Sequence, residues 1–144
     1  MEAMQNDFVS LYAMELIDTL KSDLAQVSGK RDSIKAVADQ LMRWEGTCDE
    51  KSVAAAIFHV FHHRLMVNLF VPTLGEDLFA AYIEIFNQSL MPTLQILRDP
   101  NSAWFSTKSR QELATSSLGE ACEELKTSLG DDLQLWQWGK IHSL

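Results

Sequence analysis

The segment SVAAAIFHVFHHRLMVNLFV, residues 52–71, decides the fold of this chain. Its apolar side chains point to nearly every side of a helical wheel, and a helix of this kind is generally buried at the centre of a protein. Asp49 precedes the segment as an N-terminal cap, and Pro72 follows it as a residue that interrupts helices. We therefore predict a buried central helix over about residues 50–71. Its apolar positions are Ala54, Ile57, Phe58, Val60, Phe61, Leu65, Met66, Leu69 and Phe70.

The length of this segment also fits a membrane span, which needs about 20 apolar residues. Polar side chains interrupt it, however, and each of them is unfavourable in lipid. The N-terminus of the chain shows no basic stretch followed by an apolar one, so no signal peptide is expected. The chain as it stands is therefore predicted to stay out of the membrane and in the cytoplasm. The interrupting residues are His59, His62, His63, Arg64 and Asn68.

Two helices are predicted before the central one. Apolar residues recur at helical spacing over about residues 6–26, and Gly29 follows as a breaker. Asp32 can cap a second helix, which ends before Trp44. Both patterns bury one side and leave polar residues on the other, as expected for helices packed around a core.

Two more helical segments follow the central one. The first covers about residues 74–97, and Pro92 inside it predicts a kink or a short break near residues 88–91. The last covers about residues 109–129, with Gly130 placed to cap its C-terminus. No segment has a convincing strand pattern. The prediction is an all-α protein, about five helices in a single irregular bundle.

The composition fits one helical domain over residues 1–144. Hydrophobic residues make up 47% of the chain, which is too high for a disordered one. The net charge of −8 argues against a nucleic-acid partner, since phosphate binding needs clustered Lys and Arg. The acidic residues at 120, 123 and 124, with Lys126, are interpreted as a solvated helix face that pairs locally.

The histidines of the central segment are the internal residues that suggest chemistry. His59 and His63 are four residues apart and share a helix face, with His62 beside them. Such a pair binds zinc when a third ligand converges, and Glu84 is one candidate for it. The helical zinc-hydrolase signature has Glu directly after the first His, whereas Val60 stands here. We therefore expect no metal and no cofactor, and keep His59 and His63 as the metal candidates.

Three motifs, in order along the chain, carry a resemblance to a known family. Met4-Gln5-Asn6-Asp7 begins the first helix, and Leu41 leads into Trp44-Glu45-Gly46 and the helix start Ser52-Val53-Ala54-Ala55. The chain closes with Trp136-Gln137-Trp138-Gly139-Lys140-Ile141-His142. Together these stretches resemble the large subunit of the penicillin acylases, which are N-terminal-nucleophile hydrolases. The resemblance covers nearly the whole chain.

The resemblance implies an amide hydrolase as the parent protein. In that family a serine, cysteine or threonine opens the large subunit, and its own α-amine acts as general base. Backbone and side-chain donors hold the oxyanion, and these groups lie upstream of the matched region. The implied substrates are N-acylated small molecules such as a penicillin or an acyl-homoserine lactone, and the parent family is often periplasmic or secreted. The resemblance implies structural roles, and no catalytic ones, for nine residues of this chain. They are Gln5, Asp7, Trp44, Glu45, Gly46, Trp136, Trp138, Gly139 and His142.

One internal junction could in principle release a nucleophile by self-cleavage. Gly46-Thr47 is the only place where Gly precedes Ser, Thr or Cys. A nucleophile of this class should open a β-strand, yet the residues that follow are predicted to be helical. Glycine commonly ends helices in this way, so the junction is interpreted as a turn and Thr47 as non-catalytic.

Two interpretations of the whole chain remain open at this point. In the first, the chain is a fragment or truncated homologue of a larger acylase subunit, inactive alone, and its partner is the missing part of that enzyme. In the second, it is a stand-alone helical interaction or oligomerisation module. Exposed Trp136, Trp138 and Ile141 would then bind a second copy or another protein.

Overall fold

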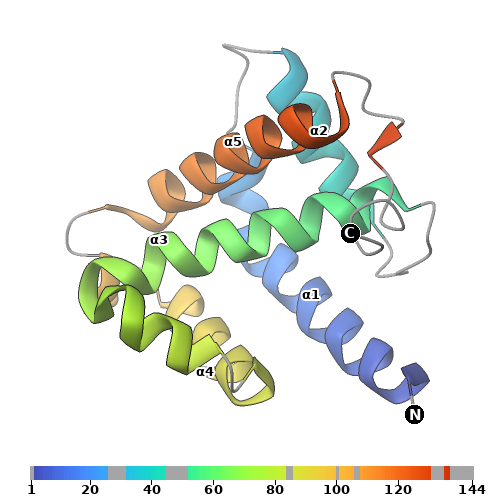
Figure 1. The fold of residues 1–144 in the computed structure, drawn as a ribbon. Coiled ribbons are helices and arrows are strands. Elements are labelled where there is room, and N and C mark those ends of the chain that lie inside the picture. Colours follow the sequence, from blue (N-terminus) through green and yellow to red (C-terminus); the bar gives the residue numbers. More distant parts are fainter. Residues whose placement is uncertain are drawn as a thin grey trace.

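A computed structural model describes residues 2–25, 32–44, 52–83, 86–99, 101–105, 108–130 and 135–136. The backbone alone is described for residues 2–10, 32, 33, 83 and 86–91. Among these described residues the regular structure is entirely helical, and the all-α prediction is confirmed (Figure 1). The elements are α1 (Glu2–Ala25), α2 (Asp32–Met42), α3 (Val53–Ile83), α4 (Phe86–Arg98), the short 3₁₀ helix η1 (Ala103–Phe105) and α5 (Arg110–Leu129).

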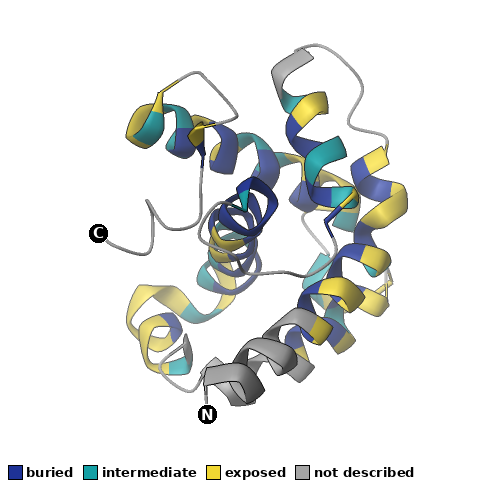
Figure 2. Cartoon of the chain, turned by 90° about the vertical axis from the view of Figure 1, so that its right-hand side faces the viewer, coloured by how far each residue is buried: buried dark blue, intermediate teal, exposed yellow. Residues whose placement is uncertain are grey.

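The first part of α3 is the centre of the core, as its sequence predicts. It packs most extensively along α5 and also against α2 and α4. Figure 2 shows α3 nearly end-on in the middle of the molecule, dark blue on the sides that face its neighbours. The side chains that it buries completely or almost completely are Ala56, Ile57, Phe61, Leu65, Met66, Leu69 and Phe70.

The region Val53–Tyr82 is also long and apolar enough to cross a membrane by length and composition. However, 72% of its most apolar window is buried inside the fold. The core helix of a globular protein passes the same test, because both environments select a long apolar helix. Burial against the other helices therefore accounts for the composition of α3.

The predicted end of the central helix is wrong by a few residues. Helical backbone continues past Pro72, and the direction changes at Gly75, whose φ of 81° and ψ of 164° are not helical. A positive φ of this size is readily adopted only by glycine, so the turn falls at Gly75 rather than at the proline. Proline has no N–H, so the Asn68 carbonyl loses its helical hydrogen bond. The helix tolerates the loss of this one bond because it lies so close to the end of the straight segment.

A short break near residues 88–91, one of the two predicted alternatives, is also wrong. Helix α4 begins at Phe86 and runs through these positions to Arg98, with Pro92 inside it. Fewer than two turns of helix precede Pro92, at 3.6 residues a turn. Little backbone is therefore displaced by the missing hydrogen bond. The region predicted as one helix over residues 74–97 is instead the end of α3 followed by α4.

Both ends of α5 are capped, and the cap at Gly130 is the one that the sequence predicts. The Ser109 hydroxyl accepts a hydrogen bond from the Glu112 N–H at 3.1 Å. At the other end Gly130 has φ 93°, and its N–H donates to the Lys126 carbonyl at 2.9 Å. These caps fix the length of the helix that packs most closely on α3.

Candidate functional site

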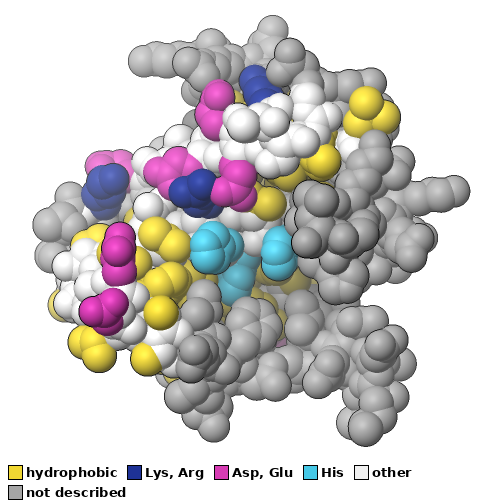
Figure 3. Space-filling model, viewed as in Figure 1, with side chains coloured by type: hydrophobic (Ala, Val, Ile, Leu, Met, Phe, Trp, Pro, Cys, Tyr) yellow, Lys and Arg dark blue, Asp and Glu magenta, His cyan; other side chains and the backbone are white. Residues whose placement is uncertain are grey.

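The histidines of α3 gather on one face of the molecule. Figure 3 shows them together in the middle of that face, beside a row of acidic and basic side chains. His59 and His63 are exposed, whereas His62 is buried. The three residues therefore have different environments although they lie within two turns of one helix.

His62 connects α3 to α1 through an aromatic cluster. Its Nε2 lies 2.8 Å from the Tyr12 Oη, a hydrogen bond whose direction depends on the imidazole tautomer. The Tyr12 ring meets the imidazole edge-on at 5.4 Å, and the Phe58 ring stacks on it at 5.5 Å. The contact holds two helices together across 50 residues of sequence.

Burial decides the protonation of this cluster. Desolvation, and then the neighbouring His59 and His63, lower the pKa of His62 to about 3. Burial, with a smaller contribution from Tyr82, raises the pKa of Tyr12 above its ordinary value. Both side chains are thus neutral at physiological pH. A buried, neutral imidazole bonded to a phenol holds helices together rather than exchanging protons with solvent.

The predicted metal candidates are not joined by a third ligand in the part of the chain that the structure describes. No group of three His, Cys, Asp or Glu side chains lies close enough there to hold a metal ion. Glu84, the suggested third ligand, lies outside the described residues. His59 and His63 are exposed on α3, and the described residues around them do not complete a metal site.

Polar contacts along the next row of α3 reach α5. The Arg64 guanidinium pairs with the Glu124 carboxylate. The Asn68 amide donates to the Ser117 hydroxyl at 3.0 Å and to the Glu120 carboxylate at 3.1 Å. The acidic face of α5 was predicted to pair locally, but these two glutamates pair with α3 instead. An ion pair this exposed contributes only about 0–1 kcal/mol, so its main effect is to fix the register of the two helices.

The structural roles expected for the nine motif residues stay a prediction, and the structure describes the side chains of two of these residues, Trp44 and Trp136. Trp44 is buried, and its ring lies 5.3 Å from that of Phe58. The backbone of Gln5 and Asp7 lies in α1, and nothing further is described for these two residues. The other motif positions Glu45, Gly46, Trp138, Gly139 and His142 lie outside the described residues, as do Thr47 and Ile141.

Trp136 corrects one part of the interaction-module prediction. It is only 1% exposed, and its Nε1 donates to the Gly130 carbonyl at 2.8 Å. The indole is held by the carbonyl at the end of α5, so both its apolar area and its N–H are satisfied within the fold. Trp136 therefore does not belong to an exposed aromatic surface.

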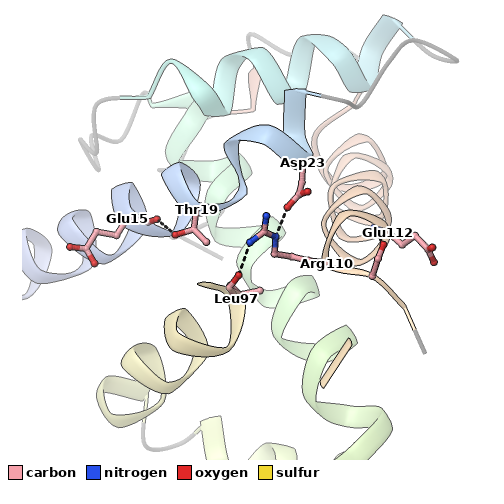
Figure 4. A network of polar contacts seen from close by, with 7 residues as sticks. Glu15, Thr19, Asp23, Leu97, Arg110 and Glu112 are labelled. Atoms are coloured by element: carbon pink, nitrogen blue, oxygen red, sulfur yellow. Dashed lines mark hydrogen bonds and ion pairs between the residues drawn. The ribbon is translucent and has the colours of Figure 1, made fainter. Parts of the chain in front are cut away.

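A buried ion pair was missed by the sequence analysis. The Arg110 Nε donates to the Asp23 carboxylate at 2.6 Å, and its Nη1 donates to the Leu97 carbonyl at 2.9 Å (Figure 4). Arg110 follows the cap of α5, where a basic residue has no helical reason to stand. The positive charge of Arg110 at this position was the one feature of the sequence that could have indicated an ion pair. Its partner Asp23 is 87 residues away, so the sequence did not identify the pair.

These features define an all-α unit whose described polar contacts connect helices to one another. Comparison with known proteins gives its family. The family model for penicillin amidase matches residues 1–144. The chain belongs to the penicillin amidase family, and the resemblance stated from its three motifs is confirmed.

The chain is similar to proteins named acyl-homoserine lactone acylase QuiP. The one from Pseudomonas aeruginosa is 29% identical over 96% of this chain, and the one from Pseudomonas putida is 28% identical over 97% of it. The chain spans only 17% and 20% of the lengths of these curated relatives. No solved structure matches the chain at a significant level.

Proposed function

We propose that these residues form a helical part of an acylase that cleaves the amide bond of N-acylated small molecules, with acyl-homoserine lactones as the first substrate class to test. The observation that carries the proposal is the match of the penicillin amidase family to residues 1–144. The names of the two Pseudomonas relatives support the substrate class. In this proposal the helices support the enzyme, and other residues of it carry the nucleophile with its α-amine and the oxyanion donors.

We further propose that the 144-residue polypeptide is inactive by itself. Most of the length of each relative lies outside the matched region, which leaves room there for the reacting groups. The described contacts support the same view. His62 is buried and neutral, and Arg64, Asn68 and Arg110 are occupied in joining helices.

The size of the native polypeptide tests this proposal first. An antibody against these residues should detect a product clearly larger than 16.3 kDa in the source organism. That product, purified, should release fatty acid from an acyl-homoserine lactone, and an acyl-enzyme adduct should be visible by intact mass. The 144-residue polypeptide should do neither.

A native product of 16.3 kDa would contradict the acylase proposal and leave the stand-alone interaction module as the explanation. Turnover or an acyl adduct on the short polypeptide would contradict its proposed inactivity instead. The adducted residue, located by peptide mapping, would then identify the nucleophile. Thr47 is the position to inspect first, because it alone follows glycine as a hydroxyl residue.

A further inference from the structure

One side of the central helix is left open by its neighbours. The non-buried residues of α3 before the turn at Gly75 include a row at helical spacing that runs for about 22 Å, at 1.5 Å per residue. We call this row the open stripe. It consists of the exposed residues His59 and His63 and of Val67, Val71 and Leu74, which are half-buried and pack in part against the core.

The two edges of the open stripe are fixed by contacts already described. On one edge Arg64 and Asn68 bind α5. On the other edge His62 binds Tyr12 of α1, and Phe70 packs against Trp104 with ring centres 5.2 Å apart. Figure 1 shows the first part of α3 between α5 and α1. The stripe is thus held in place, and the described residues around it cover it only in part.

The chemistry of the open stripe changes along its length. It begins with two exposed imidazoles and becomes apolar from Val67 onward. Beyond the turn, Leu78 is 61% exposed, in a stretch of α3 where residues 75–78 are all exposed. Glu76 and Asp77 stand exposed beside it. In Figure 3 hydrophobic side chains lie next to the histidines and extend to acidic ones.

We propose that the open stripe and Leu78 are the surface against which the rest of the acylase polypeptide packs. This inference rests on the proposed function. An apolar row with a polar border is typical of a surface that another layer covers. The relatives supply that layer, because this chain spans only 17% and 20% of their lengths. The covering segment is apolar, with basic residues where it meets Glu76 and Asp77.

A second copy of this chain fits the stripe less well. Each copy carries a net charge of −8, so two copies repel one another before any apolar contact forms. A different segment of the same enzyme does not carry this charge penalty.

Site-specific cross-linking in the full native polypeptide tests the inference. A photoreactive p-benzoyl-phenylalanine replaces His63 or Leu78 in two variants, and Gln111 in a control. Gln111 is exposed on α5 and stands apart from the open stripe. After irradiation, peptide mapping should join positions 63 and 78 to peptides outside residues 1–144, with at least tenfold less product from position 111. Circular dichroism should show that all three variants keep their helices.

The outcomes separate the two proposals. A native polypeptide that is large and active, but that gives no more product from positions 63 and 78 than from 111, would overturn the docking surface and leave the acylase proposal standing. Products that join position 63 or 78 to residues 1–144 of another copy would overturn it in favour of self-association. A native product of 16.3 kDa would contradict the acylase proposal, and it would contradict this inference as well, because the inference rests on that proposal.

Discussion

Replacing Arg110 by methionine should destabilise the chain far more than any exposed substitution. The guanidinium joins the start of α5 to Asp23 of α1 and to the last turn of α4, as Figure 4 shows. The Arg110 and Asp23 side chains are only 17% and 10% exposed. Methionine keeps most of the length of the side chain but removes its charge and its donors. The Asp23 carboxylate would then lie buried without its cation, and breaking such a pair costs about 3–5 kcal/mol.

The matched control is a second arginine, Arg98, which also bonds a carboxylate of α1. Its Nη2 lies 3.1 Å from Glu15, but these side chains are 50% and 54% exposed. Exposed pairs contribute about 0–1 kcal/mol, so Arg98→Met should lower the unfolding free energy by no more than that. The chemical change is the same in both variants, and the burial of the partner carboxylate is the difference between them.

Urea unfolding followed by circular dichroism measures both variants. For a chain of this size, a loss of about 3 kcal/mol lowers the melting temperature by roughly 6–12 °C. Combining Arg110→Met with Asp23→Asn should recover part of the loss, because the double variant no longer buries an unpaired charge. Equal losses for Arg110→Met and Arg98→Met would refute the reasoning, since burial would then make no difference.

Three further predictions concern stability. Trp136→Ala should cost about 3–5 kcal/mol in urea unfolding, and Trp136→Phe less; a loss under 1 kcal/mol for Trp136→Ala would show that the indole is not held. Unfolding free energy should fall as pH drops from 6.5 towards 3, because unfolded His62 binds a proton there and folded His62 does not; His62→Gln should flatten that slope. Gly130→Ala, at φ 93°, should cost about 1 kcal/mol, while Gly119→Ala, inside α5, should stabilise.

Local patterns in the sequence predicted most of the fold. The apolar residues of the central segment identified the core helix, and Gly130 marked the C-terminal end of α5, since a cap depends on neighbours within a few residues. The helix was expected to begin near Ser109, but the cap that this residue forms was not predicted.

Two errors in helix boundaries came from proline. Sequence rules treat Pro72 and Pro92 as breaks, whereas the folded chain keeps both helices because packing compensates for one lost hydrogen bond. A third error is the start of the central helix, which was predicted near residue 50 with Asp49 as its cap. Helix α3 instead begins at Val53, and the Ser52 hydroxyl accepts a hydrogen bond from the Ala55 N–H at 3.0 Å.

The polar contacts between helices could not be predicted from such local patterns. Tyr12 and His62 are 50 residues apart, and Arg64 and Glu124 are 60 apart, so no helical spacing relates them. The three histidines were identified as a group, but nothing in their spacing said that His62 is buried while His59 and His63 are open. That difference follows from where α1 crosses α3, which only the tertiary structure gives.

The difference between these histidines also indicates how the unit is built. Going round α3, the side with His62 is closed by α1, and the side with Arg64 and Asn68 is closed by α5. On these two sides His62, Arg64 and Asn68 all bond to neighbouring helices, although the buried Arg64 Nε has no partner among the described residues. The open stripe between them is narrow, lies on the most apolar helix and leads to an exposed leucine. A surface of that kind on a helix held firmly at both edges is suited to bind a large neighbour without rearrangement of the core.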